Sequence, residues 1–279
     1  MPRRVGIIAK TESREAVEIA KKVNRAVVDH GLTPVLEQQL SRSSRLGNGR
    51  PVNRMNVDLM ITLGGDGTVL KAVREMPNSK TPIFAINLGR SGYLTEIEPE
   101  DFEGSLKRWL DGDFQIEEQW RVAVSQNGHR IGDCLNEALL LPRTPDKMLN
   151  VAAAQNGKRI IKARADGFMV ATPTGSTAHS FSAGGPVLET SLNVLVMTLI
   201  APLQPVRSLV IPAERKLTVR LEEPGPTATL VNDGNPVKQI GLGQSLEMRR
   251  SMNSAYFVRF GDTFLQRSLR RLASERENV

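Results

Sequence analysis

The chain is organised around the stretch Val57-Asp58-Leu59-Met60-Ile61-Thr62-Leu63-Gly64-Gly65-Asp66-Gly67-Thr68. Its apolar part, 57–63, predicts a buried strand. A turn with three glycines follows, and then apolar residues are spaced as on one face of a helix that ends before Pro77. A strand, a tight turn and a helix leave backbone N–H groups at the helix start, where a phosphate can bind.

Asp66 is the unusual residue of this turn, because its carboxylate would repel a bound phosphate. A charge in that place indicates either a group that accepts a proton or one that steers a metal-bound phosphate. The alternative is a glycine-rich strand–helix turn without a ligand. The turn is not a Walker A loop, because no Gly-Lys-Ser/Thr follows. It is not a dinucleotide fingerprint either, because the third glycine of that pattern would fall at Leu70.

Length and composition limit the class of protein. With 279 residues the chain is long enough for one large or two ordinary domains. No apolar run approaches the ~20 residues of a membrane span, and Met1-Pro2-Arg3-Arg4 leads into a strand rather than a signal peptide. The single cysteine, Cys134, excludes an internal disulfide. We therefore expect a cytoplasmic protein that does not bind membranes.

The charge of the chain is basic but dispersed. Lysine and arginine number 37 against 30 acidic residues, which gives a formal charge of +7. Aromatic residues make up only 4% of the chain, which is poor for stacking on bases. We expect no nucleic-acid partner and read the charge as solvated surface that favours anionic small ligands.

The first part of the chain alternates strands and helices, which predicts a doubly wound, mostly parallel sheet with helices on both faces. A helix is expected from Ser13 to His30, and a mobile loop over 41–56, which is rich in Ser, Arg, Gly and Asn. A second glycine turn, over 87–96, follows the strand 82–87. Both glycine turns come at carboxyl ends of strands, where such sheets bind ligands, so we expect them to share a crevice.

The pattern changes near Asp111-Gly112. Short strands joined by turn signals such as Asn127-Gly128, Asn156-Gly157 and Asp233-Gly234 predict an all-β domain. We therefore expect an α/β domain over residues 1–112 and an all-β dinucleotide-binding domain over 113–261. An amphipathic helix, 262–279, is expected to pack back on the first domain.

Two stretches of the β domain are candidates for binding. Residues 164–186 contain many hydroxyls and glycines, which suit a ribose, an amide or a phosphate; the alternative is a loop whose Ser and Thr side chains bond to its own backbone. The pair Asn136-Glu137 interrupts an apolar run, and burying it is costly unless it has partners. The alternative is that one of the two side chains faces solvent.

Together these motifs resemble the NAD kinase family, in the family's order and over about residues 5 to 260. The residues that carry the resemblance are Gly64-Gly65-Asp66-Gly67-Thr68, the turn 87–96, Asn136-Glu137, Asp166-Gly167, Thr172-Pro173-Thr174-Gly175-Ser176-Thr177-Ala178 and Ser182-Ala183-Gly184-Gly185-Pro186. The first motif is shared with lipid kinases and phosphofructokinase-type enzymes, whereas the stretch that begins at Thr172 is more specific.

The resemblance implies an enzyme that phosphorylates the 2′-hydroxyl of the adenosine ribose of NAD to give NADP. Its donor would be ATP or polyphosphate, its general base Asp66, and its cofactor Mg²⁺, held largely by the donor phosphates. Two rivals remain: another kinase of the Gly-Gly-Asp-Gly superfamily that acts on a lipid or sugar, and a dinucleotide-binding regulator without catalysis.

The resemblance also assigns residues to the substrates, and no protein metal site. The donor phosphates would be bound by Gly64, Gly65, Gly67 and Thr68. NAD would be bound by Asp66, Gly67, Lys71, Asn136, Glu137, Lys147, Arg164, Asp166, Thr177, Ala178, His179, Ser180, Ser182 and Ala201. The family forms homodimers and homotetramers, so we expect one of these, with Ala201 reaching a neighbouring subunit's site. His179 and Leu203 depart from the family's usual tyrosine and histidine, which bears on the preference between NAD and NADH.

Overall fold

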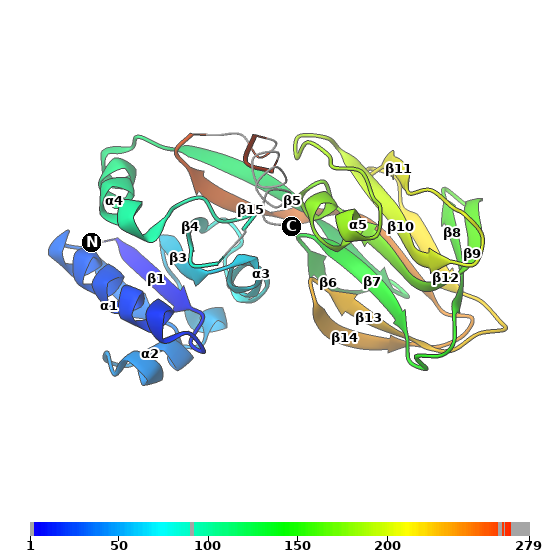
Figure 1. Ribbon diagram of the computed structural model, residues 1–279, viewed down its shortest axis with the longest axis horizontal. Helices are drawn as coiled ribbons and strands as arrows, with labels where there is room; N and C mark the ends of the chain where they lie inside the picture. The colour runs from blue at the N-terminus through cyan, green and yellow to red at the C-terminus, as the bar shows by residue number, and fades with distance from the viewer. Residues whose placement is uncertain (1–2, 90–91, 262–263, 265, 269–279) are drawn as a thin grey trace, which may run out of the picture. The chain divides into compact units, whose positions relative to one another are not determined.

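The structure is a computed structural model that describes residues 3–89, 92–261, 264 and 266–268. The chain divides into two compact units, each with its own apolar core (Figure 1). Unit 1 comprises residues 1–118 and 254–279, and unit 2 comprises residues 119–253. Two long strands, β5 (Gln115–Gln126) and β15 (Ser245–Arg259), continue from one unit into the other.

Unit 1 is built on a parallel sheet with the strand order β2-β1-β3-β4-β15. This confirms the predicted α/β fold of the first domain. Its strands are β1 (Arg4–Ala9), β2 (Thr33–Leu36), β3 (Leu59–Gly64), β4 (Pro82–Asn87) and the end of β15. Its helices are α1 (Arg14–Asp29), α2 (Gln38–Ser44), α3 (Asp66–Glu75) and α4 (Phe102–Asp111), with short 3-10 turns η1 (Val52–Arg54) and η2 (Pro99–Asp101).

Helix α1 has the ends that its sequence predicts. The hydroxyl of Ser13 accepts the N–H of Ala16 at 3.2 Å and so caps the first turn. Gly31 follows the helix with φ +72°, a conformation that favours glycine. Residues of α1 and α4 pack into one apolar cluster with β1, β3 and β4.

The strand order places a topological switch beside β1. Helix α1 connects β1 to β2 on one side, and α3 connects β3 to β4 on the other (Figure 1). Because such crossovers are right-handed, α1 and α3 lie on opposite faces of the sheet, and the carboxyl ends of β1 and β3 open a crevice between them. The glycine turn after β3 therefore lies where a ligand is expected.

The prediction of a mobile loop over 41–56 is wrong for much of that segment. The Glu37 carboxylate accepts the N–H groups of Gln39 and Leu40 at 2.8 and 2.9 Å, which starts α2, and η1 follows further along. Leu40 and Val52 are both buried. These two apolar side chains anchor the segment, although its composition is that of a loop.

Unit 2 is an antiparallel β structure, as predicted. Its sheet has the order β14-β13-β7-β9-β8-β12-β15, with β10 joining β9 to β11 and with β5 pairing β6. The strands are β6 (His129–Cys134), β7 (Glu137–Pro142), β8 (Leu149–Gln155), β9 (Lys158–Ala171), β10 (Val194–Pro202), β11 (Leu209–Pro212), β12 (Leu217–Leu221), β13 (Ala228–Asn232) and β14 (Asn235–Ile240). Two short helical turns, η3 (Thr174–Thr177) and α5 (His179–Ser182), follow β9.

The three turn signals of this unit have the expected backbone. Asn127-Gly128, Asn156-Gly157 and Asp233-Gly234 all have positive φ at both residues, as two-residue hairpin turns require. Of the predicted helix 262–279, most lies outside the described residues. Phe264 and Arg267, which the structure does describe, are helical and buried. Within the described ranges no helix has the length and apolar character needed to cross a membrane.

Candidate active site

The three glycines of the turn have different roles. A Cβ on Gly64 would lie 2.4 Å from Thr68 Oγ1, so packing within the turn requires glycine there. A Cβ on Gly65 or Gly67 would meet nothing within 4 Å. These two glycines therefore leave open surface at the start of α3, where backbone N–H groups and the helix dipole favour an anion.

A pocket of about 280 Å³ lies at this surface. It is lined by the turn and α3 on one side and by the end of β1 and α2 on the other, through Ala9, Lys10, Thr11, Glu12, Gln39, Gly65, Gly67, Thr68 and Lys71. Lys71 Nζ lies 3.5 Å from Gln39 Oε1 and 3.7 Å from Glu37 Oε1, which directs its ammonium towards α2. Two lysines beside a helix start suit a phosphate chain.

Sequence reasoning missed the half of this pocket that β1 and α2 supply. Lys10 and Thr11 directly follow β1, and their position was a usable signal, since ligands bind at the carboxyl ends of strands on both sides of a switch point. Gln39 carried no such signal, because its segment was expected to lead into a loop.

The second glycine turn lies against the first and holds Asp66. Asp66 Oδ2 accepts the N–H of Tyr93 at 2.9 Å, and Oδ1 accepts that of Leu94 at 3.1 Å. A Cβ on Gly92 would lie 2.0 Å from Thr95 Oγ1 and 3.1 Å from Asp66 Oδ1, so only glycine allows this approach. The two turns thus meet as the sequence predicts, and the second one orients the carboxylate of the first.

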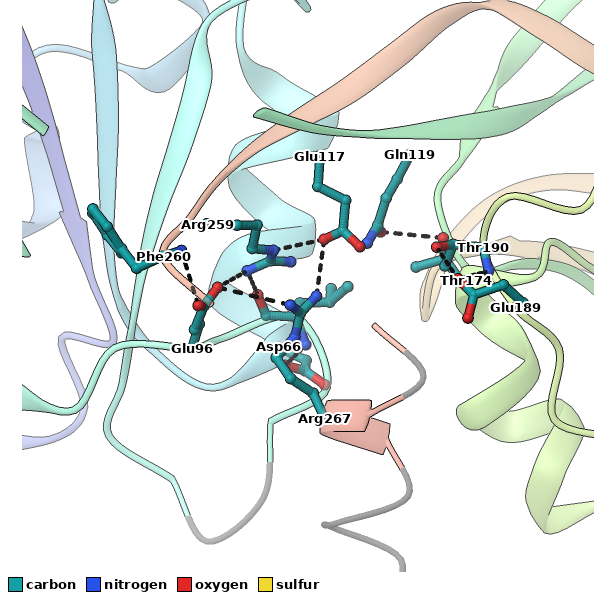
Figure 2. A network of polar contacts seen from close by, with 11 residues as sticks. Asp66, Glu96, Glu117, Gln119, Thr174, Glu189, Thr190, Arg259, Phe260 and Arg267 are labelled. Atoms are coloured by element: carbon teal, nitrogen blue, oxygen red, sulfur yellow. Dashed lines mark hydrogen bonds and ion pairs between the residues drawn. The ribbon is translucent and has the colours of Figure 1, made fainter. Parts of the chain in front are cut away.

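A group of ion pairs anchors the second turn from its other side (Figure 2). Arg259 donates to the Leu94 carbonyl at 3.1 Å and to Glu117 Oε2 at 2.6 Å. Arg267 also donates to Glu117, at 2.9 Å. Burial alone would raise the pKa of Glu117, but the two guanidinium groups outweigh it and hold that pKa below its usual value. Sequence reasoning did not find these residues.

In unit 2, Asn136 directly precedes β7 and Glu137 begins it, and both polar side chains are buried. In the described part of the chain, Asn136 Oδ1 and Glu137 Oε2 have no hydrogen-bond partner. Burial, followed by the charge of Asp233, raises the pKa of Glu137 to about 7. Buried polar atoms without partners are costly, so Asn136 and Glu137 are candidates for contact with a ligand.

The stretch that starts at Thr172 packs directly on this pair. Thr172 donates its N–H to the Asn136 carbonyl at 2.8 Å. A Cβ on Gly175 would lie 2.1 Å from that same carbonyl oxygen, so glycine is required. The structure thus brings together two motifs that are far apart in the sequence.

Two hydroxyls of the loop bond to the loop's own backbone, and a third bonds to a neighbouring strand. Ser176 donates to the Pro173 carbonyl at 2.6 Å, and Thr177 donates to the Thr174 carbonyl at 3.2 Å. Ser180 is fully buried, with its Oγ 3.0 Å from Thr198 Oγ1. Bonding to the loop's own backbone therefore accounts for the hydroxyls of Ser176 and Thr177, whereas Ser180 bonds to β10. The other predicted members differ: Ala178 is half-buried, whereas His179 and Ser182 are exposed.

The remaining predicted residues lie on β9, β10 and the loop before β8. Arg164 and Asp166 are exposed on β9, and the pairing of β9 with β10 sets Ala201 opposite Asp166. Ala201 has φ +43°, an unusual conformation that marks functional sites more often than plain strands. Lys147 is exposed, with its ammonium 3.5 Å from Asp146. The strand register therefore sets Ala201 level with Asp166, between the pairs Ile200–Gly167 and Pro202–Ala165, whereas Lys147 lies in a separate pair.

Taken together, these features are typical of a phosphate-transferring enzyme: a doubly wound domain with an open glycine turn and an oriented carboxylate, and a β domain with a buried polar pair. Comparison with known proteins specifies the class further. Models of the ATP-NAD kinase N-terminal domain and the ATP-NAD kinase C-terminal domain match residues 5–114 and 135–260.

Curated relatives match along nearly the whole chain. A NAD kinase of Methanosphaera stadtmanae is 35% identical over 266 residues, covering 94% of this chain and 96% of its own length. A NAD kinase of Methanothermobacter thermautotrophicus is 33% identical over 267 residues, covering 95% and 94%. This chain belongs to the NAD kinase family.

Solved structures have the same fold. An NAD kinase from Archaeoglobus fulgidus in complex with ATP has a TM-score of 0.78 and 31% identity, covering 96% of this chain and 99% of that one. A yeast NADH kinase complexed with NADH has a TM-score of 0.87 at 20% identity, covering 98% and 88%, and supports the fold alone.

Proposed function

We propose that this chain transfers a phosphoryl group from ATP to the 2′-hydroxyl of the adenosine ribose of NAD, giving NADP. The observation that carries the proposal is the position of Asp66, a carboxylate held by two backbone N–H groups at the start of α3, beside a pocket of about 280 Å³. Membership of the NAD kinase family supports the proposal, and so does the fact that the curated relatives are NAD kinases.

Asp66 is the general base of this proposal. Its carboxylate accepts the N–H groups of Tyr93 and Leu94, one on each oxygen. The two contacts also fix the side chain, which lowers the entropy cost of positioning it. When the ribose hydroxyl attacks phosphorus, its proton passes to Asp66, a step worth about 10²–10⁴ in rate.

The pocket beside the turn is the proposed donor site. Gly65 and Gly67 let the phosphate chain approach the backbone, and Thr68 offers a hydroxyl. Lys10 and Lys71 supply the positive charge that offsets the phosphates. Lys71, which the resemblance assigns to NAD, lines this pocket as well.

A divalent cation fits the chemistry of this pocket. Glu12 and Thr68 offer oxygen ligands, which Mg²⁺ prefers, and the donor phosphates would supply the others. When bound, Mg²⁺ neutralises charge on the transferred phosphoryl group. The protein's own part is to hold the phosphates and orient the acceptor hydroxyl.

The acceptor site that we propose in unit 2 centres on Asn136 and Glu137. Their buried, unpartnered oxygens suit hydroxyl donors, which a ribose provides. Asp166 and Ala201 contribute to the nicotinamide side, and the exposed His179 offers a ring for stacking. Arg164, Lys147, Ala178 and Ser182 complete the proposed contacts, with Thr177 and Ser180 shaping the wall from within.

We further propose that the protein is a homodimer or homotetramer. Leu203, Val210 and Leu192 are large apolar side chains of unit 2 that are exposed in the single chain. Leu203 lies two residues after Ala201, the residue expected to reach a neighbouring subunit's site, whereas Val210 lies on β11 opposite Val196 and Leu192 precedes β10. Light scattering of the purified protein distinguishes a monomer from either assembly.

The test of function is direct. Purified protein is incubated with NAD, Mg²⁺ and either ATP or polyphosphate, and the product is read with an NADP-specific dehydrogenase. We expect NADP with ATP. If NADP forms with polyphosphate but not with ATP, the proposed reaction stands and polyphosphate is the phosphoryl donor. If NAD binds but neither donor yields NADP, the protein is a regulator and the proposal is wrong.

A further inference from the structure

Asp233 makes an unusual set of contacts at the turn between β13 and β14. Its carboxylate accepts three consecutive backbone N–H groups, from Leu135 at 2.7 Å, Asn136 at 2.8 Å and Glu137 at 3.1 Å. Its own N–H donates to the Glu137 carbonyl at 3.0 Å. One turn residue therefore fixes the backbone of the whole 135–137 segment, from nearly a hundred positions away.

The 135–137 segment depends on such contacts. Leu135 and Asn136 lie between β6 and β7, outside either strand. On the other side, Thr172 and Gly175 pack against Asn136, as described above. The segment is thus clamped between the β13–β14 turn and the end of β9. The same segment carries the buried, unpartnered oxygens Asn136 Oδ1 and Glu137 Oε2.

We propose that Asp233 is a positioning residue that holds Asn136 and Glu137 in the geometry required to bind a ribose of NAD. This inference rests on the proposed function. Asp233 acts through backbone contacts, so its effect falls on the affinity for the dinucleotide and not on the donor.

A turn-forming role alone does not explain an aspartate here. Asp233 and Gly234 have φ of +45° and +74°, and Asn-Gly serves such a turn at least as well as Asp-Gly. Burial raises the pKa of Asp233, because the ionised carboxylate is less stable away from water. The three N–H groups that it accepts act in the opposite direction and lower that pKa. Only a carboxylate accepts from all three donors, because an amide would turn its NH₂ group towards one of them.

The charge of Asp233 also reaches Glu137. Burial is the larger cause of the raised pKa of Glu137, and the negative charge of Asp233 is the second cause. The other charged or titratable groups beside these two are Arg121 on β5 and Asp133 and Cys134 on β6. Removing the charge of Asp233 therefore shifts the titration of Glu137 to lower pH. Hydration of Glu137 in a loosened segment would lower that titration as well, because burial is its larger cause, so the unchanged affinity for ATP and the melting temperature of the variant are read beside it.

The experiment uses the full chain and measures NAD binding by calorimetry between pH 5.5 and pH 8.5, chosen to span roughly the pKa of Glu137. Asp233→Asn keeps the turn and removes the carboxylate. Asp133→Asn is the matched control, because it removes a neighbouring buried carboxylate that bonds Arg121 and Asn253 instead of the segment. Asn136→Ala tests the NAD site itself.

We expect Asp233→Asn to weaken NAD binding at least tenfold, with ATP binding within twofold of wild type and the pH midpoint of NAD binding lowered. Asp133→Asn should leave that midpoint in place. Unchanged NAD affinity in Asp233→Asn, with weaker binding in Asn136→Ala, would overturn the role of Asp233 alone. Unchanged affinity in Asn136→Ala would show that the proposed NAD site is wrong, and the inference with it.

A second measurement needs no variant, should Asp233→Asn not fold. Hydrogen exchange of the wild-type protein reports on the N–H groups of Leu135 and Asn136, which have no strand ladder to protect them. We expect slow exchange of both in the absence of NAD. Exchange as fast as in an exposed loop would contradict the clamp.

Discussion

Arg259 and Asp66 are linked through a single residue of the second glycine turn. Arg259 Nη1 donates to the Leu94 carbonyl at 3.1 Å, and the Leu94 N–H donates to Asp66 Oδ1 at 3.1 Å. Leu94 is thereby held on both sides of its backbone. The orientation of the proposed base thus depends on an arginine 193 positions later in the sequence.

The first prediction concerns this link. Arg259→Met should lower kcat about tenfold or more, with KM changed less, because the turn that orients Asp66 loses its anchor. It should also destabilise unit 1 by about 3 kcal/mol, since Glu117 keeps its buried charge with a single guanidinium. Steady-state kinetics and thermal unfolding measure the two effects. Arg74→Met removes an arginine from a partly exposed pair of the same unit and should change neither quantity.

The second prediction contrasts two glycines of the same turn. Gly67→Ala places its methyl group in open space, so the free energy of unfolding should stay within about 0.5 kcal/mol of wild type. KM for ATP should rise about tenfold, because the methyl group keeps the phosphates away from the backbone. Gly64→Ala forces its methyl group against Thr68 and should lower the melting temperature. Equal stability of the two variants, by scanning calorimetry, would contradict the distinction drawn from the packing.

The third prediction concerns the part of the pocket that β1 supplies. Lys10→Ala should raise KM for ATP about tenfold and leave KM for NAD nearly unchanged, because its charge faces the donor pocket. Lys107→Ala, on the exposed face of α4, is the matched loss of one positive charge. A similar rise in KM for ATP in both variants would point to net charge instead of the pocket.

The fourth prediction follows from Glu137, whose pKa is raised from 4.5 to about 7. Between these values the folded protein binds more protons than the unfolded one, so stability falls as pH rises through that window. The Glu137→Gln variant lacks this titration. The free energy of unfolding of wild type, measured against the variant, should fall by up to about 3 kcal/mol from pH 4.5 to pH 7 and then level off. A constant difference across the window would contradict the raised pKa.

Sequence reasoning predicts the features that have a local cause. The glycine turn at Asp66 lies between a strand and a helix with clear periodicity, and the ends of α1 follow from Ser13 and Gly31. The change from helical to strand periodicity near residue 112 likewise predicts an all-β second part. Each of these signals lies within a few residues of the structure that it predicts.

Long-range contacts account for what the sequence could not predict. The pair Asp233-Gly234 predicts only a hairpin turn, because nothing near it in the sequence shows that the Asp233 carboxylate meets the N–H groups of 135–137. Arg259 and Glu117 pair across more than a hundred positions. The buried Leu40 and Val52 anchor a segment whose composition predicts a loop. In all three cases tertiary packing decides the role of the residue.

The most direct measurement of the central claim is the turnover of Asp66→Asn with NAD, ATP and Mg²⁺. Asparagine keeps the size of the side chain and can still accept an N–H of the second turn, but it cannot take the proton of the ribose hydroxyl. We predict that kcat falls by about 10²–10⁴ while the variant still folds and still binds NAD. A folded Asp66→Asn variant that forms NADP at a near-normal rate would contradict the role of Asp66 as general base.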